Sequence, residues 1–121
     1  MSPLTLAFLG DAVYELLVRQ YLVAQGNRPS GQLHRLAVGK VCAGAQSAVY
    51  DLLEPLLTPE EDAILKRGRN AHPGHLPKHA QPADYRRATG VEALFGYLYL
   101  KGDLSRIEEL FLRIQKEEEG E

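Results

Sequence analysis

Apolar residues recur every three to four positions along most of the chain, which is the spacing of helices that bury one face. Glycines, prolines and small polar residues divide this pattern into six stretches. We therefore predict helices over residues 3–25, 30–40, 43–54, 58–70, 84–100 and 104–114, and a loop over residues 71–82. No stretch shows the strict alternation and tight turns of paired strands, so the predicted fold is all-α.

Several helices begin with recognisable capping residues. The clearest is Thr58, which precedes Pro59 and is followed three residues later by Glu61, a capping box with proline in the first turn. The predicted N-caps are Ser2, Ser30, Thr58 and Asp103. These signals fix where each helix starts more firmly than the apolar pattern alone.

Two acidic residues stand inside apolar helical stretches. Asp11 falls on one helical line whose other members are apolar, namely Leu4, Val18 and Leu22. Glu92 is the sole acid of its own apolar run. An ionised carboxylate on such a face costs several kcal/mol or more unless a partner, a proton or a cation compensates it.

Each of these acids also has a helical glycine close by, Gly10 beside Asp11 and Gly96 one turn after Glu92. Glycine inside a helix costs about 0.5–1 kcal/mol relative to alanine, so a packing or access requirement is indicated. Two carboxylates facing each other across a helix pair can hold Mg²⁺, which takes one or two protein carboxylates and keeps other positions for water and phosphate. The alternative is that each acid pairs with a basic residue, and Glu92 could meet Arg86 or Arg87.

Overall composition and charge leave the function open. The chain has 121 residues, so it is predicted to form one domain over residues 1–121. Its net charge of −2 does not by itself indicate nucleic-acid binding. The lone Cys42 excludes an internal disulfide and a cysteine-based zinc site and fits a reducing, cytoplasmic location. No stretch reads as a membrane span or an export signal. The acidic residues 117–121 are expected to be solvated and frayed.

Positive charge is nevertheless concentrated in one region. Only Asp84 opposes the basic residues found between positions 66 and 87, which are Lys66, Arg67, Arg69, Lys78, Arg86 and Arg87. Such a local surface suits phosphates, although a solvated helix end is the plain alternative. Three nearby histidines, at positions 72, 75 and 79, lack a thiolate neighbour, which disfavours a zinc site.

Several motifs together resemble a known family. The stretch Phe8-Leu9-Gly10-Asp11-Ala12-Val13 resembles the signature helix of the ribonuclease III catalytic domain, and the stretch from Glu92 to Leu100 resembles its second acidic motif. Gln32-Leu33-His34 and Lys66-Arg67-Gly68-Arg69-Asn70-Ala71 follow the pattern of the small Mini-ribonuclease III members. Larger members carry two further acids, at the positions that here hold Ala7 and Thr89.

The resemblance implies a homodimeric, Mg²⁺-dependent endoribonuclease that cuts double-stranded RNA to 5′-phosphate and 3′-hydroxyl ends and matures precursor 23S ribosomal RNA. Asp11 and Glu92 would be the catalytic and metal-binding acids, with Glu15 and Thr89 in the outer shell, although Glu15 could instead pair with Arg19. No double-stranded-RNA-binding domain is expected beside the catalytic domain, so RNA binding is expected to rely on Lys66, Arg67, Arg69, Asn70, Lys78, Arg86 and Arg87. The alternatives are a non-catalytic RNA- or ribosome-binding protein on the same fold and, less favoured, a helical adaptor.

Overall fold

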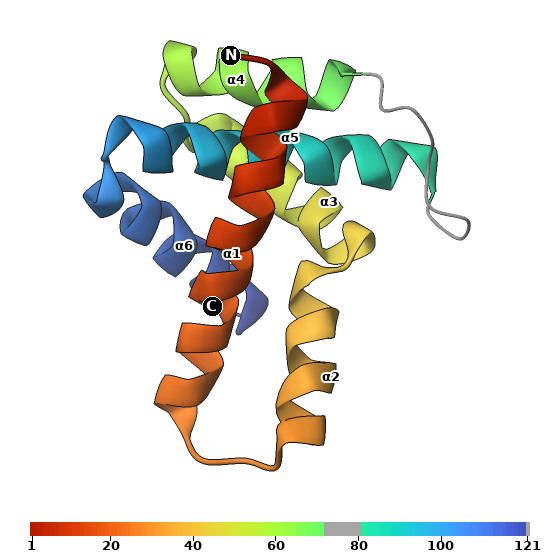
Figure 1. Ribbon diagram of the computed structural model, residues 1–121, viewed down its shortest axis with the longest axis vertical. Coiled ribbons are helices and arrows are strands. Elements are labelled where there is room, and N and C mark those ends of the chain that lie inside the picture. The colour runs from red at the N-terminus through yellow and green to blue at the C-terminus, as the bar shows by residue number, and fades with distance from the viewer. Residues whose placement is uncertain (72–80, 121) are drawn as a thin grey trace.

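A computed structural model describes residues 1–71 and 81–120, and all the regular structure within them is helical. The elements are α1 (Pro3–Gln25), α2 (Ser30–Val41), α3 (Ala43–Leu53), the short 3₁₀ helix η1 (Glu54–Leu56), α4 (Pro59–Asn70), α5 (Pro82–Lys101) and α6 (Leu104–Glu118) (Figure 1). The all-α prediction is confirmed. Within the described ranges, no helix is both long enough and apolar enough to cross a membrane.

Most helix starts follow the predicted caps. Ser2 accepts a hydrogen bond from the backbone of α1, Thr58 and Glu61 form both bonds of the capping box, and Asp103 accepts from the first turn of α6. Ser30 is the exception, because it is the first helical residue and Pro29 occupies the N-cap with no side-chain bond. Pro29 already holds the extended backbone that a cap requires, so the helix begins one residue earlier than a Ser30 cap would place it.

Three helix ends differ from the prediction. Helix α5 begins at Pro82, two residues before Asp84, because proline fits the first turn of a helix. Pro55 does not end the chain's helical path at once, since it lies within η1. Helix α6 continues to Glu118, whose carboxylate pairs with Lys40 at 2.9 Å, so the first residues of the predicted frayed tail are helical.

Helix α5 is the centre of the molecule. Helix α1 crosses it on one side, α4 runs along another, and α3 and α6 pack against it as well (Figure 1). Tyr14 of α1 contacts the Phe95 ring edge-on at 5.2 Å, and Phe111 of α6 lies 5.8 Å from Tyr14. The second half of α1 and all of α2 extend away from this body as a pair of antiparallel helices (Figure 1).

Glycines set the closest helix contacts. A Cβ atom on Gly10 would overlap the carbonyl oxygen of Glu92 and lie 2.8 Å from the backbone nitrogen of Gly96. A Cβ atom on Gly96 would overlap the carbonyl oxygen of Leu6 in return. Helices α1 and α5 therefore touch backbone to backbone, which is the packing reason that the two helical glycines indicated. Gly68 and Gly90 do the same between α4 and α5, at 2.8 Å from a Cβ of Gly68 to the Gly90 Cα.

One buried ion pair connects α4 with α6. Glu61 of α4 is only 6% exposed and accepts two hydrogen bonds from Arg106 of α6, at 2.9 Å from Nε and 2.8 Å from Nη2. The same guanidinium donates to the carbonyl of Leu56 at 3.0 Å. This network ties η1, α4 and α6 together.

Candidate active site

The crossing of α1 and α5 brings Asp11 and Glu92 together. Gly10 rests on the Glu92 carbonyl, so the next residue of α1 stands at the edge of the crossing, where Glu92 is partly buried and Asp11 is exposed. The prediction that Asp11 lies on a buried stripe is wrong. The buried row of α1 runs through Leu6, Gly10, Tyr14, Val18 and Leu22, four residues apart, and Asp11 sits beside this row on the rim.

The environment of Glu92 favours its protonated form. Burial, and to a smaller extent the facing Asp11 carboxylate, together raise the pKa of Glu92 to about 8. Within the described residues, neither acid takes part in an ion pair. The alternative in which Arg87 neutralises Glu92 is not what this chain adopts, because Arg87 points its Nη1 to the Ser47 hydroxyl at 3.5 Å.

A buried glutamine completes the surroundings of the two acids. Gln46 of α3 is 1% exposed, and neither its amide oxygen nor its amide nitrogen has a hydrogen-bond partner in the part of the chain that the structure describes. Its amide faces Glu92 and favours the ionised carboxylate. Gln46 is not among the site residues predicted from the sequence, although it occupies a core position in the helical series continued by Val49, Tyr50 and Leu53.

The arrangement fits a hard divalent cation. Residues 1–71 and 81–120 contain no cluster of three or more His, Cys, Asp or Glu side chains suited to a metal, so a cation here would rely on two carboxylates with water or substrate as further ligands. That donor set is the one Mg²⁺ prefers. The unpartnered amide of Gln46 shows that polar atoms around Glu92 have capacity for a further partner.

Comparison with known proteins places this geometry in a family. Residues 4–103 match the model of the ribonuclease III domain. The chain belongs to the ribonuclease III family. A protein named Mini-ribonuclease 3 from Symbiobacterium thermophilum is 48% identical over 110 residues, which cover 91% of this chain and 85% of that protein. A Mini-ribonuclease 3 from Brevibacillus brevis is 48% identical over 99% of this chain and 90% of its own length.

A solved structure supports the same assignment. A protein from Fusobacterium nucleatum, known from its crystal structure, matches with a TM-score of 0.88 and 33% identity, over 98% of this chain and 94% of that one. The family acts on double-stranded RNA, and this member is an endoribonuclease of the Mini-ribonuclease 3 type. The all-helical body and the paired acids therefore belong to a nuclease.

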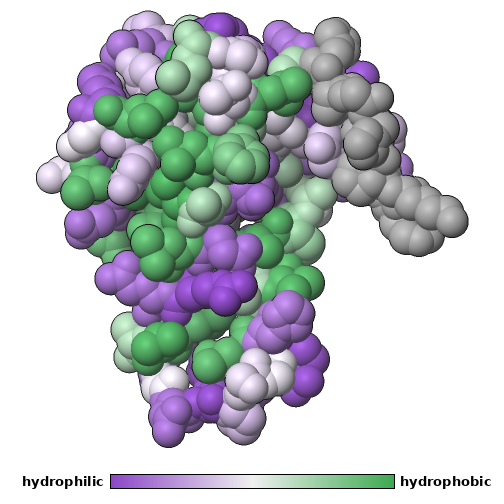
Figure 2. Space-filling model, in the orientation of Figure 1, coloured by the Kyte–Doolittle hydropathy of each residue, from purple (hydrophilic) through white to green (hydrophobic). Residues whose placement is uncertain are grey.

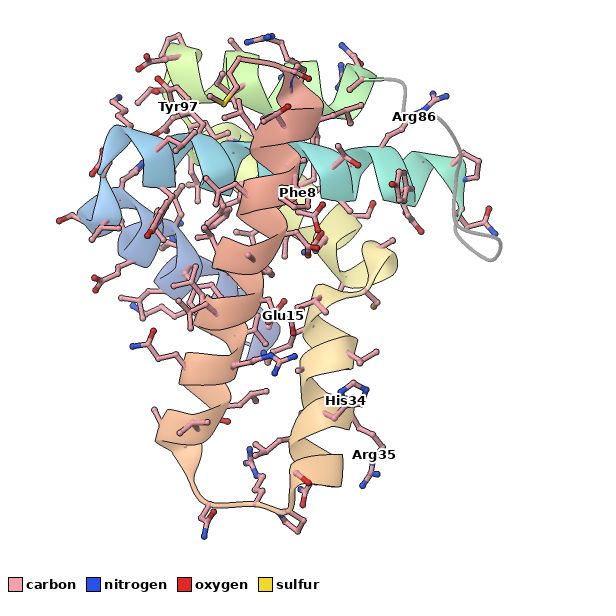
Figure 3. The ribbon with its side chains drawn as sticks, in the orientation of Figure 1. Phe8, Glu15, His34, Arg35, Arg86 and Tyr97 are labelled. Carbon is pink, nitrogen blue, oxygen red and sulfur yellow. The ribbon has the colours of Figure 1, made fainter. Side chains whose placement is uncertain are left out.

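The two outer-shell candidates of this ribonuclease III chain differ in their surroundings. Glu15 pairs with Arg19 at 3.1 Å, as the alternative interpretation of its spacing predicted (Figure 3). Thr89 is 7% exposed, lies three residues before Glu92 on α5, and donates its hydroxyl to the Tyr85 carbonyl at 2.9 Å. Thr89 keeps an oxygen lone pair available, whereas the Glu15 carboxylate is already engaged.

The candidate RNA-binding residues fall into two groups. Arg69 donates to the Tyr50 hydroxyl at 2.9 Å and to the Asn70 side chain at 3.1 Å, and the exposed Arg86 lies in the N-terminal part of α5 (Figure 3). Arg69 through Tyr50, and Arg87 through the Ser47 hydroxyl, lie where α4 and α5 meet α3. Arg69 and Arg87 therefore face neutral partners and keep their positive charge for a ligand.

The other candidates are placed differently. Lys66 lies between the carboxylates of Glu54 at 2.8 Å and Asp62 at 2.7 Å, and these hydrogen bonds raise its pKa, with Asp62 the larger cause. Arg67 donates to the carbonyl of Met1 at 3.3 Å, at the start of α1. Lys78 and the three histidines lie outside the described residues. Lys66 is thus neutralised within the fold, unlike Arg69.

Proposed function

We propose that this chain cleaves double-stranded RNA with Mg²⁺ held by Asp11 and Glu92, and that it matures the ends of precursor 23S ribosomal RNA. One observation carries the proposal. Two carboxylates from different helices face each other across a backbone-to-backbone crossing, and no basic side chain of the described residues neutralises them. A fold gains nothing in stability from such a pair, because like charges in a partly buried site repel.

The chemistry of phosphodiester hydrolysis explains what the acids are for. When bound, Mg²⁺ supplies an activated water and offsets the charge that develops on the phosphate. Asp11 and Glu92 would hold the ion, and their separate helices fix the gap between them. Burial and Asp11 raise the pKa of Glu92 to about 8, so Glu92 would have to give up its proton in order to hold the ion.

The arginines at the junction of α3, α4 and α5 would bind the RNA backbone. Double-stranded RNA is recognised mainly by its shape and by its phosphates and 2′-hydroxyls, so no base-reading element is needed. Arg69, Arg86 and Arg87 are the strongest candidates, with Asn70 adjoining Arg69. Arg67 and Lys78 remain candidates, and Lys66 contributes least because its charge is offset.

The proposal includes a homodimer. On the face turned to the viewer in Figure 2, hydrophobic side chains gather over α1 and the neighbouring parts of α5 and α6. The exposed large apolar residues of these helices include Phe8 at 84%, Leu16, Tyr99 and Leu104, and the last three line an apolar groove of about 270 Å³. An apolar face of this kind marks a protein contact, and a second copy would bury Phe8 one turn from Asp11 in each subunit.

A cleavage assay tests the function. The full-length protein is incubated with a duplex RNA and Mg²⁺, and Asp11→Asn and Glu92→Gln are compared with Asp51→Asn, which changes an exposed acid on α3. We expect both site variants to lose cleavage by about a thousandfold or more, as several kcal/mol of charge stabilisation disappear, while RNA binding and the dimer persist. Full activity of either site variant would refute the assignment.

A non-catalytic RNA- or ribosome-binding role is the second candidate. It is favoured by the two positions where larger family members carry acids, because Ala7 packs in a small apolar cluster with Leu6 and Ala93, and Thr89 is bonded to its own helix. This role predicts duplex binding without Mg²⁺-dependent cleavage. The same assay therefore separates the two candidates.

The ribosomal substrate and the cytoplasmic location rest on the family resemblance and on the single cysteine, which suits a reducing compartment. A duplex formed by the two ends of precursor 23S ribosomal RNA should be cut at discrete positions. An unrelated duplex of equal length is the control. Equal cleavage of both would remove the ribosomal precursor as the preferred substrate.

A further inference from the structure

The fold offers no use for the buried amide of Gln46. Its side chain is 1% exposed, and among residues 1–71 and 81–120 both of its polar atoms lack partners, whereas Arg28 and Gln115 each leave one buried nitrogen without a partner. A buried amide without hydrogen bonds is costly, and a fold that keeps one usually binds something there. Removing its polar atoms would relieve the fold, so packing does not explain why a glutamine stands at this position.

The position of Gln46 on α3 points to the carboxylate site. Its neighbour Ser47 contacts Arg87 of α5, and Tyr50, one turn further on, lies against Gly90 of α5. These two contacts place the face of α3 that carries Gln46 along the segment of α5 that leads to Glu92.

We propose that Gln46 is a positioning residue of the nuclease site, whose amide nitrogen orients the Glu92 carboxylate and whose amide oxygen accepts a hydrogen bond from a water bound to the cation. This rests on the proposed function. Partners of this kind orient metal-binding carboxylates, and their loss typically lowers metal affinity or activity by about 10- to 100-fold. The donor and acceptor of one amide fit the two tasks without any change in charge.

The chain contains a matched control. Gln115 of α6 is also a buried glutamine, at 3% exposed. Its amide nitrogen has no partner among the described residues, but its amide oxygen accepts a hydrogen bond from Lys40 at 2.8 Å. Methionine is unbranched and close to glutamine in length, so Gln46→Met and Gln115→Met make the same exchange at two buried sites. The first removes polar atoms without partners, and the second breaks a hydrogen bond that belongs to the fold.

The test measures Mg²⁺ affinity by calorimetry on the metal alone, thermal unfolding, and the kinetics of duplex cleavage. For Gln46→Met we expect Mg²⁺ affinity and kcat to fall about 10- to 100-fold, with KM for RNA unchanged and a midpoint of unfolding equal to or above that of the wild type. For Gln115→Met we expect a lower unfolding midpoint with wild-type Mg²⁺ affinity.

Two results would overturn the inference: wild-type Mg²⁺ affinity and kcat in Gln46→Met, or a fall in its unfolding midpoint as large as that of Gln115→Met. The failure of the proposed function looks different. In that case the wild type shows no Mg²⁺-dependent cleavage, or Asp11→Asn and Glu92→Gln leave cleavage intact. If those two variants lose activity while Gln46→Met keeps it, only the role of Gln46 is rejected.

Discussion

Glu61 is buried and Glu92 is partly buried, and the two glutamates meet opposite partners. Glu61 of α4 is bound by the guanidinium of Arg106 through two hydrogen bonds and accepts another from the backbone of Thr58. Burial alone would raise the pKa of Glu61, but the contacts from Arg106 and Thr58 together outweigh burial and lower it. Glu92 of α5 faces Asp11 instead, and burial together with that carboxylate raises its pKa to about 8.

The comparison shows that the partner, and not burial, decides what an interior acid does. A glutamate matched by arginine is a structural joint, because its charge is already satisfied within the chain. A glutamate set against another carboxylate has an unmet need for positive charge, and that need makes it a candidate ligand for a cation. The same residue type thus serves stability at Glu61, between α4 and α6, and under the proposed function it serves chemistry at Glu92 of α5.

The largest expected effect comes from breaking the matched pair. Arg106→Leu leaves Glu61 buried without its cation, which should lower the free energy of unfolding by about 3–5 kcal/mol. Urea unfolding at pH 7 measures this. The double variant Glu61→Leu with Arg106→Leu should recover much of the loss, because no isolated charge remains. If the free energy of unfolding of Arg106→Leu lies within about 1 kcal/mol of the wild-type value, as for a surface ion pair, the structural role of the Glu61–Arg106 pair is contradicted.

Breaking the unmatched pair should do the reverse. Glu92→Gln is expected to stabilise the protein in a chelating buffer above about pH 7, because the wild type must ionise a carboxylate whose folded-state pKa is about 8 against an ordinary value of 4.5. Each pKa unit corresponds to about 1.4 kcal/mol.

The raised pKa of Glu92 also sets the direction in which stability changes with pH. Between about pH 4.5 and pH 8 the folded wild type holds a proton on Glu92 that the unfolded chain releases, so its stability should fall as the pH rises through this window. Urea unfolding at several pH values should show this slope in the wild type and a shallower one in Glu92→Gln. Parallel curves for the two proteins would show that Glu92 ionises normally.

The glycine at the crossing should matter more than a glycine in the open. Gly96→Ala pushes a methyl group into the Leu6 carbonyl, which should cost about 1–3 kcal/mol or more and lower cleavage by moving Asp11 away from Glu92. Gly39→Ala on α2, where a Cβ meets nothing within 4 Å, should instead stabilise by up to about 1 kcal/mol. Thermal unfolding of both variants tests the contrast, and equal effects would show that α1 and α5 can separate freely.

The smallest effect contrasts two cations of α4. Arg69→Gln should reduce the salt dependence of duplex binding by about 0.9 in the log–log slope, a value established for B-form DNA. Lys66→Gln should leave the slope nearly unchanged, because Glu54 and Asp62 already offset the Lys66 charge. Binding titrations at several salt concentrations measure both, and a larger change for Lys66 would reverse the assignment.

Local signals in the sequence predicted the helices well. Apolar spacing and the caps at Ser2, Thr58 and Asp103 determine the starts of α1, α4 and α6, because a capping residue acts within three positions of its own helix. The end of α6 was beyond reach in this way. It depends on Lys40, which lies 78 positions from Glu118 and is brought to it by the fold.

The site was only partly predictable for the same reason. Asp11 and Glu92 stand out because an acid in an apolar run conflicts with its surroundings, and a functional residue often causes such a conflict. Glu54 offsets the charge of Lys66 because η1 brings the two side chains together, and spacing in the sequence alone does not indicate this contact. Gln46 could have been found, since it interrupts an otherwise apolar helical row.

The backbone contact at Gly10 and Gly96 also bears on how this scaffold could be altered. Main-chain atoms, which cannot choose another rotamer, define the spacing between the two acid-bearing helices. Core side chains further along α1, such as Val18 and Leu22, could be exchanged to tune heat tolerance while the gap between the acids stays fixed. The crossing therefore fixes the distance between the helices that carry Asp11 and Glu92.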